Sequence, residues 1–277
     1  SHNTDHGDAV AMRPQLKDYA RPAIIDFIRQ KVEDSGGNGV IVGLSGGIDS
    51  VTVSKLCCDA IGPDKVLNLY MPSATSPSSD RLDAEKFCRQ VGTELQAIDI
   101  APAVAAFSSL LAGMDRRDLA GNVTARCRMI ILFHYAKLTG RVVMGTNNKS
   151  ELLTGYFTKF GDGGSDFCPI GDLYKTEVRQ LAREIGVPDS IIDKAPSAGL
   201  WEGQTDERDM GITYDELDQA LFGIERGLDD LAIVAETSLS LEKVAKVRSM
   251  YNSSVHKRKM PLIPKLGIRT IGMDWRE

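Results

Sequence analysis

The residues best suited to chemistry lie in the segment Val40–Ser50, which reads Val-Ile-Val-Gly-Leu-Ser-Gly-Gly-Ile-Asp-Ser. A β-branched run ends in Ser-Gly-Gly and a helix-like apolar pattern follows at once, which predicts a strand, a tight turn and a helix N-terminus. The unpaired N–H groups of such a turn form an anion site. Ser45 and Ser50 add hydroxyl donors, and the carboxylate of Asp49 suits a phosphate site if a hard cation such as Mg²⁺ lies between them. Taken alone, Gly46-Gly47 also fits a purely structural turn, since the segment is neither a Walker A loop nor a dinucleotide fingerprint.

A second polar stretch runs from Met144 to Asp166 and supplies a carboxylate, a lysine and a glycine-rich acidic turn. The carboxylate of this stretch is Glu151. Glu151 and Asp49 follow different predicted strands, so both can reach one cation at the same rim of a sheet. Two carboxylates together with phosphate oxygens and waters suit Mg²⁺. The alternative for Glu151 is a solvated carboxylate favoured by the dipole of a helix N-terminus.

Short apolar strands alternate with helices in the first half of the chain, which predicts an α/β fold with a doubly wound parallel sheet flanked by helices. We expect strands at 39–44, 65–71, 94–100 and 141–145, and helices at 16–35, 49–60, 80–91, 102–113, 121–139, 174–186, 213–222, 227–236 and 240–252. Ligands bind at the carboxyl ends of such strands, which places Ser45, Ser73 and Thr146 along one rim. We find no linker, so we expect a disordered tail over 1–12 and a single domain over 13–277.

The composition is that of an ordinary globular protein, with 277 residues, 42% hydrophobic residues and a net charge of −5. An acidic balance argues against nucleic acid as a partner, and no apolar run is long enough to cross a membrane. The cysteines form no C-x-x-C pair, which indicates reduced core thiols in a cytoplasmic protein and argues against zinc or iron–sulfur sites. They are Cys57, Cys58, Cys88, Cys127 and Cys168.

The turn Ser45–Ser50 resembles the Ser-Gly-Gly-x-Asp-Ser pyrophosphate loop of the N-type ATP pyrophosphatases, which have an adenine-nucleotide α-hydrolase-like fold. Those enzymes cleave ATP between the α- and β-phosphates and adenylate a substrate. Within that superfamily, further motifs resemble the NAD synthetases over nearly the whole chain. They are Thr146-x-x-x-x-Glu151, Gly155–Gly164, Ala195–Trp201, Gln204–Glu207, Gly211–Asp215 and His256–Pro261.

The resemblance implies a set of site residues. Asp49 and Glu151 would hold Mg²⁺, and Asp49, Lys175 and Asp166 would be catalytic, with Asp166 a candidate for taking a proton from ammonium. ATP would contact Gly43, Leu44, Ser45, Gly46, Gly47, Ile48, Asp49, Ser50, Thr146, Lys175 and Ser197. Deamido-NAD would contact Arg126, Lys159, Asp166, His256 and Lys257, since basic side chains suit its pyrophosphate and carboxylate.

Each of these residues has a simpler interpretation. Arg126 fits a solvated cation on a basic helix, and the segment 256–259 fits a flexible basic tail. Lys175 opens a predicted helix, where the dipole disfavours a cation, and this misfit favours a functional role. Asp162 and Asp166 fit turn formers, and for Asp162 we leave that alternative open.

The function implied is the ammonia-dependent amidation of deamido-NAD to NAD with ATP. Only 44 residues precede Ser45, and none is Cys, so we expect free ammonia rather than glutamine as the nitrogen donor. A homodimer is expected, with the apolar faces of 121–139 and 227–252 as candidate interfaces, and loops 72–80 and 199–211 are expected to be mobile. The alternatives are another N-type pyrophosphatase, either GMP synthetase-like or tRNA-modifying, and a non-enzymatic nucleotide sensor.

Overall fold

The computed structural model describes residues 12–276, and the predicted disordered tail lies outside the described residues except for Met12. Met12 is 1% exposed and its Sδ accepts a hydrogen bond from Arg226 at 3.1 Å. Its terminal methyl also packs close to Gly223, where an added Cβ would lie 3.1 Å from it. The prediction was therefore wrong for Met12, which belongs to the folded domain because its thioether is buried.

A parallel sheet of four strands forms the centre of the N-terminal half, in the order β3-β2-β1-β4. Val40 on β1 lies opposite Val66 on β2 and Val142 on β4. The strands are shorter than predicted, and their bounds are β1 Val40–Gly43, β2 Val66–Tyr70, β3 Glu94–Ala97 and β4 Val142–Met144. The sheet confirms the predicted doubly wound fold.

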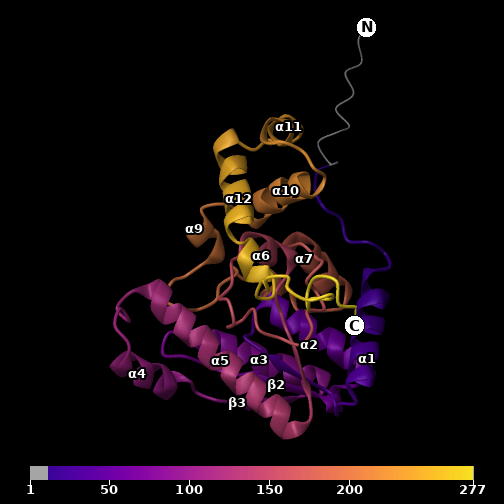
Figure 1. The fold of residues 1–277 in the computed structure, drawn as a ribbon. Coiled ribbons are helices and arrows are strands. Elements are labelled where there is room, and N and C mark those ends of the chain that lie inside the picture. The colour runs from indigo at the N-terminus through magenta and orange to yellow at the C-terminus, as the bar shows by residue number, and fades with distance from the viewer. Residues whose placement is uncertain (1–11, 277) are drawn as a thin grey trace.

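Helices cover both faces of this sheet, and Figure 1 shows α5 crossing in front of the strands. Side chains alternate between the faces, so Val40 and Val42 join one hydrophobic cluster and Ile41 joins another. The first cluster is covered by α1 (Ala20–Ser35), α2 (Ile48–Ile61), α3 (Ser78–Val91) and α7 (Lys175–Glu184), and the second by α4 (Ala101–Leu110) and α5 (Arg117–Thr139). α5 begins before its predicted start at 121, because Asp118 in its first turn suits a helix N-terminus.

The C-terminal helices form a hydrophobic cluster of their own, at the top of Figure 1 and away from the sheet. It consists mainly of α10 (Tyr214–Glu225), α11 (Asp230–Glu236) and α12 (Leu241–Ser253). The short helix α6 (Lys149–Thr154) packs against this cluster through Leu153. Periodicity did not predict the other short helices, which are α8 (Asp189–Ile192), α9 (Asp206–Met210) and the 3₁₀ turns Pro63–Lys65 and Val255–Arg258.

All five cysteines are unpaired, and Cys168 alone among them is half-buried rather than buried. Burial raises the pKa of Cys168 to about 11, so this thiol keeps its proton near neutral pH. Cys57, Cys58, Cys88 and Cys127 lie in the hydrophobic clusters, as predicted for core thiols, whereas Cys168 lies outside them. Within residues 12–276, no helix has the length and apolar character needed to cross a membrane.

Candidate active site

The turn between β1 and α2 has the backbone of an anion site. Gly46 has a φ of +84°, and a Cβ there would lie 2.4 Å from the carbonyl oxygen of Asp80, so only glycine fits. The Oγ of Ser50 accepts the Ser45 N–H at 3.1 Å and lies 3.0 Å from the Ser45 Oγ. The buried hydroxyl of Ser50 therefore shapes the turn, and the first N–H groups of α2 remain for a ligand.

Lys194 fixes this turn from outside, and sequence reasoning missed it. Its Nζ donates to the Gly46 carbonyl oxygen at 3.2 Å. The same ammonium pairs with Asp80 at 3.1 Å and Asp83 at 2.5 Å, both on α3. An isolated lysine outside any quoted motif carries no local signal, so its role depends on the tertiary structure alone.

The two carboxylates predicted to bind metal come together at the side chain of Asn148. Its Nδ2 donates to Asp49 Oδ1 at 3.2 Å and to Glu151 Oε1 at 2.7 Å. Asn147 holds the other oxygen of Glu151 at 3.0 Å. Asn148 is also the N-cap of α6, and its side chain accepts the Glu151 N–H at 3.0 Å. One residue therefore caps the start of the helix and also orients the carboxylate of Glu151.

Lys175 lies in the same cluster, with its Nζ 2.5 Å from Asp49 Oδ2. The residue is 1% exposed, and its ammonium lies 5.2 Å from the ring centroid of Tyr214. Burial by itself lowers the pKa of this lysine, but Asp49 and Glu151 outweigh it and the pKa is raised. Lys175 is thus a buried, charged ammonium at the first residue of α7.

A third carboxylate, Asp206, is buried close to this cluster. Its Oδ2 accepts the Tyr214 hydroxyl at 2.9 Å, and its Oδ1 has no hydrogen-bond partner. Asp206 contributes to the raised pKa of Lys175, while burial and the charge of Asp49 hold the pKa of Glu151 well above its usual range. One ammonium thus lies among three carboxylates, of which Asp49 pairs with it directly. Burial raises the pKa of both Glu151 and Asp206, and a divalent cation would favour their charged forms.

The donor set suits Mg²⁺ shared with a substrate better than a cage made of protein alone. Asp49 and Glu151 offer hard oxygen ligands, which Mg²⁺ prefers. Among residues 12–276, no group of three or more His, Cys, Asp or Glu side chains has the arrangement to hold a metal ion. Phosphate and water oxygens would therefore have to complete the coordination.

The remaining residues predicted to contact ATP lie on several segments. Thr146 is half-buried just after β4, the strand next to β1. The hydroxyl of Ser197 accepts the Gly199 N–H at 3.0 Å, and Thr75 donates to the Gly199 carbonyl at 2.8 Å. The two loops predicted to be mobile therefore touch. Leu44 and Ile48 are buried in the core, so any contact that they make with ATP must come from backbone atoms.

Four of the five residues predicted to contact deamido-NAD form one cationic group. Arg126 donates to the carbonyl oxygen of Lys159 at 3.2 and 3.1 Å, and the Nζ of Lys159 lies 3.2 Å from His256 Nδ1. The Nζ of Lys257 donates to the carbonyls of Gly155 and Phe157, both at 2.8 Å. Burial lowers the pKa of Lys257; the charge of Asp162 opposes the shift and outweighs the smaller contribution of Arg126. An anion bound here would favour the charged form of this lysine.

Asp166, the fifth of these residues, pairs with the edge of the sheet. Its Oδ2 accepts the Val143 N–H at 2.7 Å, and its own N–H donates to the Val143 carbonyl at 3.0 Å. Asp162 accepts the Thr158 N–H at 2.7 Å, as the alternative of a turn former requires. The carboxylates of Asp162 and Asp166 thus both bind backbone groups, and the proposed part of Asp166 in proton transfer stays a prediction.

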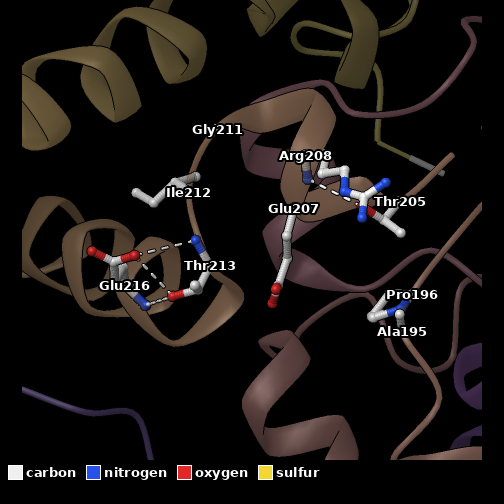
Figure 2. Close-up of a pocket in the computed structure, with 9 residues that line it drawn as sticks. All are labelled: Ala195, Pro196, Thr205, Glu207, Arg208, Gly211, Ile212, Thr213 and Glu216. Carbon is white, nitrogen blue, oxygen red and sulfur yellow. Dashed lines mark hydrogen bonds between the residues drawn. The ribbon is translucent and has the colours of Figure 1, made fainter.

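A pocket of about 400 Å³ is lined in part by Thr205 and Glu207, the chain neighbours of Asp206, and Figure 2 shows its lining residues. They come from the segment before Ser197, from α9 and its N-cap, from the connection between α9 and α10, and from the start of α10. They are Ala195, Pro196, Thr205, Glu207, Arg208, Gly211, Ile212, Thr213 and Glu216. None was predicted to bind ATP or deamido-NAD. Glu207 accepts the Tyr214 N–H at 3.1 Å, so the pocket wall also holds the tyrosine that binds Asp206.

Some residues that form this cluster or bind its carboxylates lie in the sequence motifs but were not predicted to have a role. Asn147 and Asn148 lie inside the second polar stretch, and Asp206 and Tyr214 lie in motifs quoted only for their resemblance. Two amides directly before a candidate metal ligand were an available signal. Neither Asp206 nor Tyr214 follows a strand, so their position gave no sign of a role in the site. The motifs that contain them were the only available signal.

The chain is similar to known proteins over most of its length. Residues 21–261 match the family model described as NAD synthase. The NH(3)-dependent NAD(+) synthetase of Methanococcoides burtonii is 45% identical over 249 residues, covering 89% of this chain and 95% of the relative. The protein of that name from Archaeoglobus fulgidus is 47% identical, with 88% and 95% covered.

Two solved structures have the same fold. The NMN synthetase from Francisella tularensis superposes with a TM-score of 0.79 at 35% identity. The NH3-dependent NAD synthetase from Campylobacter jejuni, in complex with the nitrate ion, does so with a TM-score of 0.77 at 33% identity. Each match covers 89% of this chain and 98% of the other.

Proposed function

The chain belongs to the NAD synthase family, and from that premise we propose that it amidates deamido-NAD with ammonia, converting ATP to AMP and pyrophosphate. The observation that carries the proposal is that side chains suited to two anionic substrates lie at the two ends of α6. Asn148, the N-cap of α6, binds both Glu151 and Asp49, while Gly155, just past the end of α6, binds Lys257. A helix of this length spans roughly 9 Å. Two anionic substrates can therefore lie side by side.

The first site suits the triphosphate of ATP. The N–H groups that open α2 and the ammonium of Lys175 offer donors to phosphate oxygens. Mg²⁺ held by Asp49 and Glu151 would neutralise charge on the phosphates when bound. Lys175 is already charged and fixed by burial, so it needs no reorganisation when the pyrophosphate leaves.

The second site suits the dinucleotide acid. Arg126, Lys159, His256 and Lys257 offer cations and ring nitrogens to its pyrophosphate and carboxylate. The nicotinate carboxylate attacks the α-phosphate of ATP, the bond between the α-phosphorus and the bridging oxygen breaks, and pyrophosphate leaves. The resulting adenylate makes the carboxylate oxygen part of a good leaving group. Ammonia then adds to the carbonyl carbon and AMP departs. The main contribution of these residues is to hold both substrates in line. Asp166 is the candidate acceptor of the proton from ammonium.

We place the reaction in a cytoplasmic homodimer. Ile130, Phe133 and Leu138 on α5 are large apolar side chains exposed on one helix, which favours a second copy as a partner. The unpaired cysteines match the thiol state that a reducing cytoplasm maintains. Light scattering of the purified chain tests the dimer, and a monomer at micromolar concentration would contradict it.

Product analysis tests the reaction itself. The chain is incubated with ATP, Mg²⁺ and either deamido-NAD or deamido-NMN, and NAD, NMN, AMP and pyrophosphate are measured. The second substrate is included because the NMN synthetase from Francisella tularensis is 35% identical to this chain. We expect ammonium chloride, and not glutamine alone, to support NAD formation with deamido-NAD as the better substrate. A higher kcat/KM for deamido-NMN would change the assigned substrate, and no AMP release with either would refute the reaction.

A further inference from the structure

Asp218, on α10 in the C-terminal cluster, is a buried carboxylate that the proposed chemistry does not use. It is 0% exposed and lies far along the sequence from both metal ligands. Its Oδ1 accepts the hydroxyl of Ser150 at 2.5 Å, and its Oδ2 accepts the Thr176 N–H at 2.9 Å. Asp218 therefore binds two segments at once, the start of α6 and the start of α7.

These two segments carry the residues on which the site depends. Ser150 directly precedes Glu151, and Thr176 directly follows Lys175. The Oγ of Ser150 also accepts the Lys175 N–H at 2.9 Å, which closes a ring of three hydrogen bonds. Because Ser150 and Lys175 are themselves buried, no solvent replaces these bonds when one is removed.

We propose that Asp218 is a positioning residue for catalysis, which locks the segment carrying Glu151 to the segment carrying Lys175. This inference rests on the proposed function, since it assigns the C-terminal cluster a part in building the magnesium and phosphate site. Residues that hold metal ligands in this way typically change metal affinity or activity 10–100-fold when replaced. We expect a loss of that size for Asp218→Ala.

The chain offers a matched control for a merely structural role. Ser54 is also 0% exposed, and its hydroxyl donates at 2.6 Å to the side chain of Asn68 in the core. Ser150→Ala and Ser54→Ala thus each remove one buried hydroxyl that binds a side-chain oxygen. Only Ser150 lies next to a residue of the proposed site.

The test measures metal binding directly as well as turnover. Mn²⁺ binding to the full chain is followed by electron paramagnetic resonance with a non-hydrolysable ATP analogue. We expect Ser150→Ala and Asp218→Ala to weaken Mn²⁺ binding and lower kcat by roughly 10-fold or more, with KM for deamido-NAD within about twofold. Asp218→Asn keeps one acceptor for Thr176 and should fall between wild type and Asp218→Ala. Ser54→Ala should keep the Mn²⁺ affinity of the wild type.

Equal Mn²⁺ affinity and kcat in Ser150→Ala and Ser54→Ala would overturn the inference. Should Asp218→Ala fail to fold, Ser150→Ala and Asp218→Asn still decide it, because each keeps part of the hydrogen-bond ring. A wild-type chain that binds no Mn²⁺ in the presence of the analogue would instead refute the proposed metal site. The two failures are therefore distinguishable.

Discussion

Lys175→Met removes the single ammonium that faces the three carboxylates of the site. Methionine fills the space of the aliphatic stem without its charge. Removing one partner of a buried ion pair costs about 3–5 kcal/mol, because the other charge stays buried and uncompensated. At about 2–3 °C per kcal/mol for a chain of this size, we expect Tm to fall by roughly 6–15 °C.

Lys55→Met is the matched control for this change. Lys55 also lies 2.5 Å from an aspartate, Asp59, but the two side chains are 25% and 22% exposed. Side chains in the Lys175–Asp49 pair are 2% and 18% exposed. A partly solvated pair is worth about 0–1 kcal/mol, so the control should lose little stability.

The assay is thermal unfolding with and without Mg²⁺, in the absence of nucleotide. Lys175 competes with a cation for Asp49, so Mg²⁺ alone should raise the Tm of Lys175→Met more than that of the wild type. Equal losses of Tm in the two variants would refute the buried ion pair as the cause. Equal responses to Mg²⁺ in the variant and the wild type would contradict the competition between Lys175 and the cation for Asp49.

Three further predictions follow from the site. Asp49→Asn and Glu151→Gln should each abolish pyrophosphate release that depends on deamido-NAD while the far-ultraviolet circular dichroism stays unchanged; full activity in either would rule out the metal assignment. Lys159→Ala and Lys257→Ala should weaken deamido-NAD binding in titration calorimetry far more than ATP binding, and equal losses for both ligands would contradict the separate cationic site. Burial raises the pKa of Asp218 to about 6, so the folded state binds its proton more tightly than the unfolded state and loses stability as pH rises from about 4 to 6. The free energy of unfolding of the wild type, relative to Asp218→Asn, should fall by about 3 kcal/mol over that window in urea titrations, and a constant difference would contradict the shift.

Local patterns were enough to predict the sheet and the tight turn between β1 and α2. Val40, Ile41 and Val42 alternate between two hydrophobic clusters, as a strand covered on both faces requires. Gly46 needs its positive φ because the turn bends tightly between a strand and a helix. Both features depend on neighbouring residues, so periodicity and turn chemistry carry the information.

The contacts that make the site depend on residues far apart in the chain. Lys175 binds Asp49 across 126 positions, and Asp218 binds Ser150 across 68. Periodicity cannot predict which buried polar groups will meet, because that depends on how the C-terminal helices pack against the sheet. The sequence alone determined which residues could hold phosphate and metal. Tertiary packing decided which charged groups pair with one another, because only burial makes an unpaired carboxylate costly enough to require a partner.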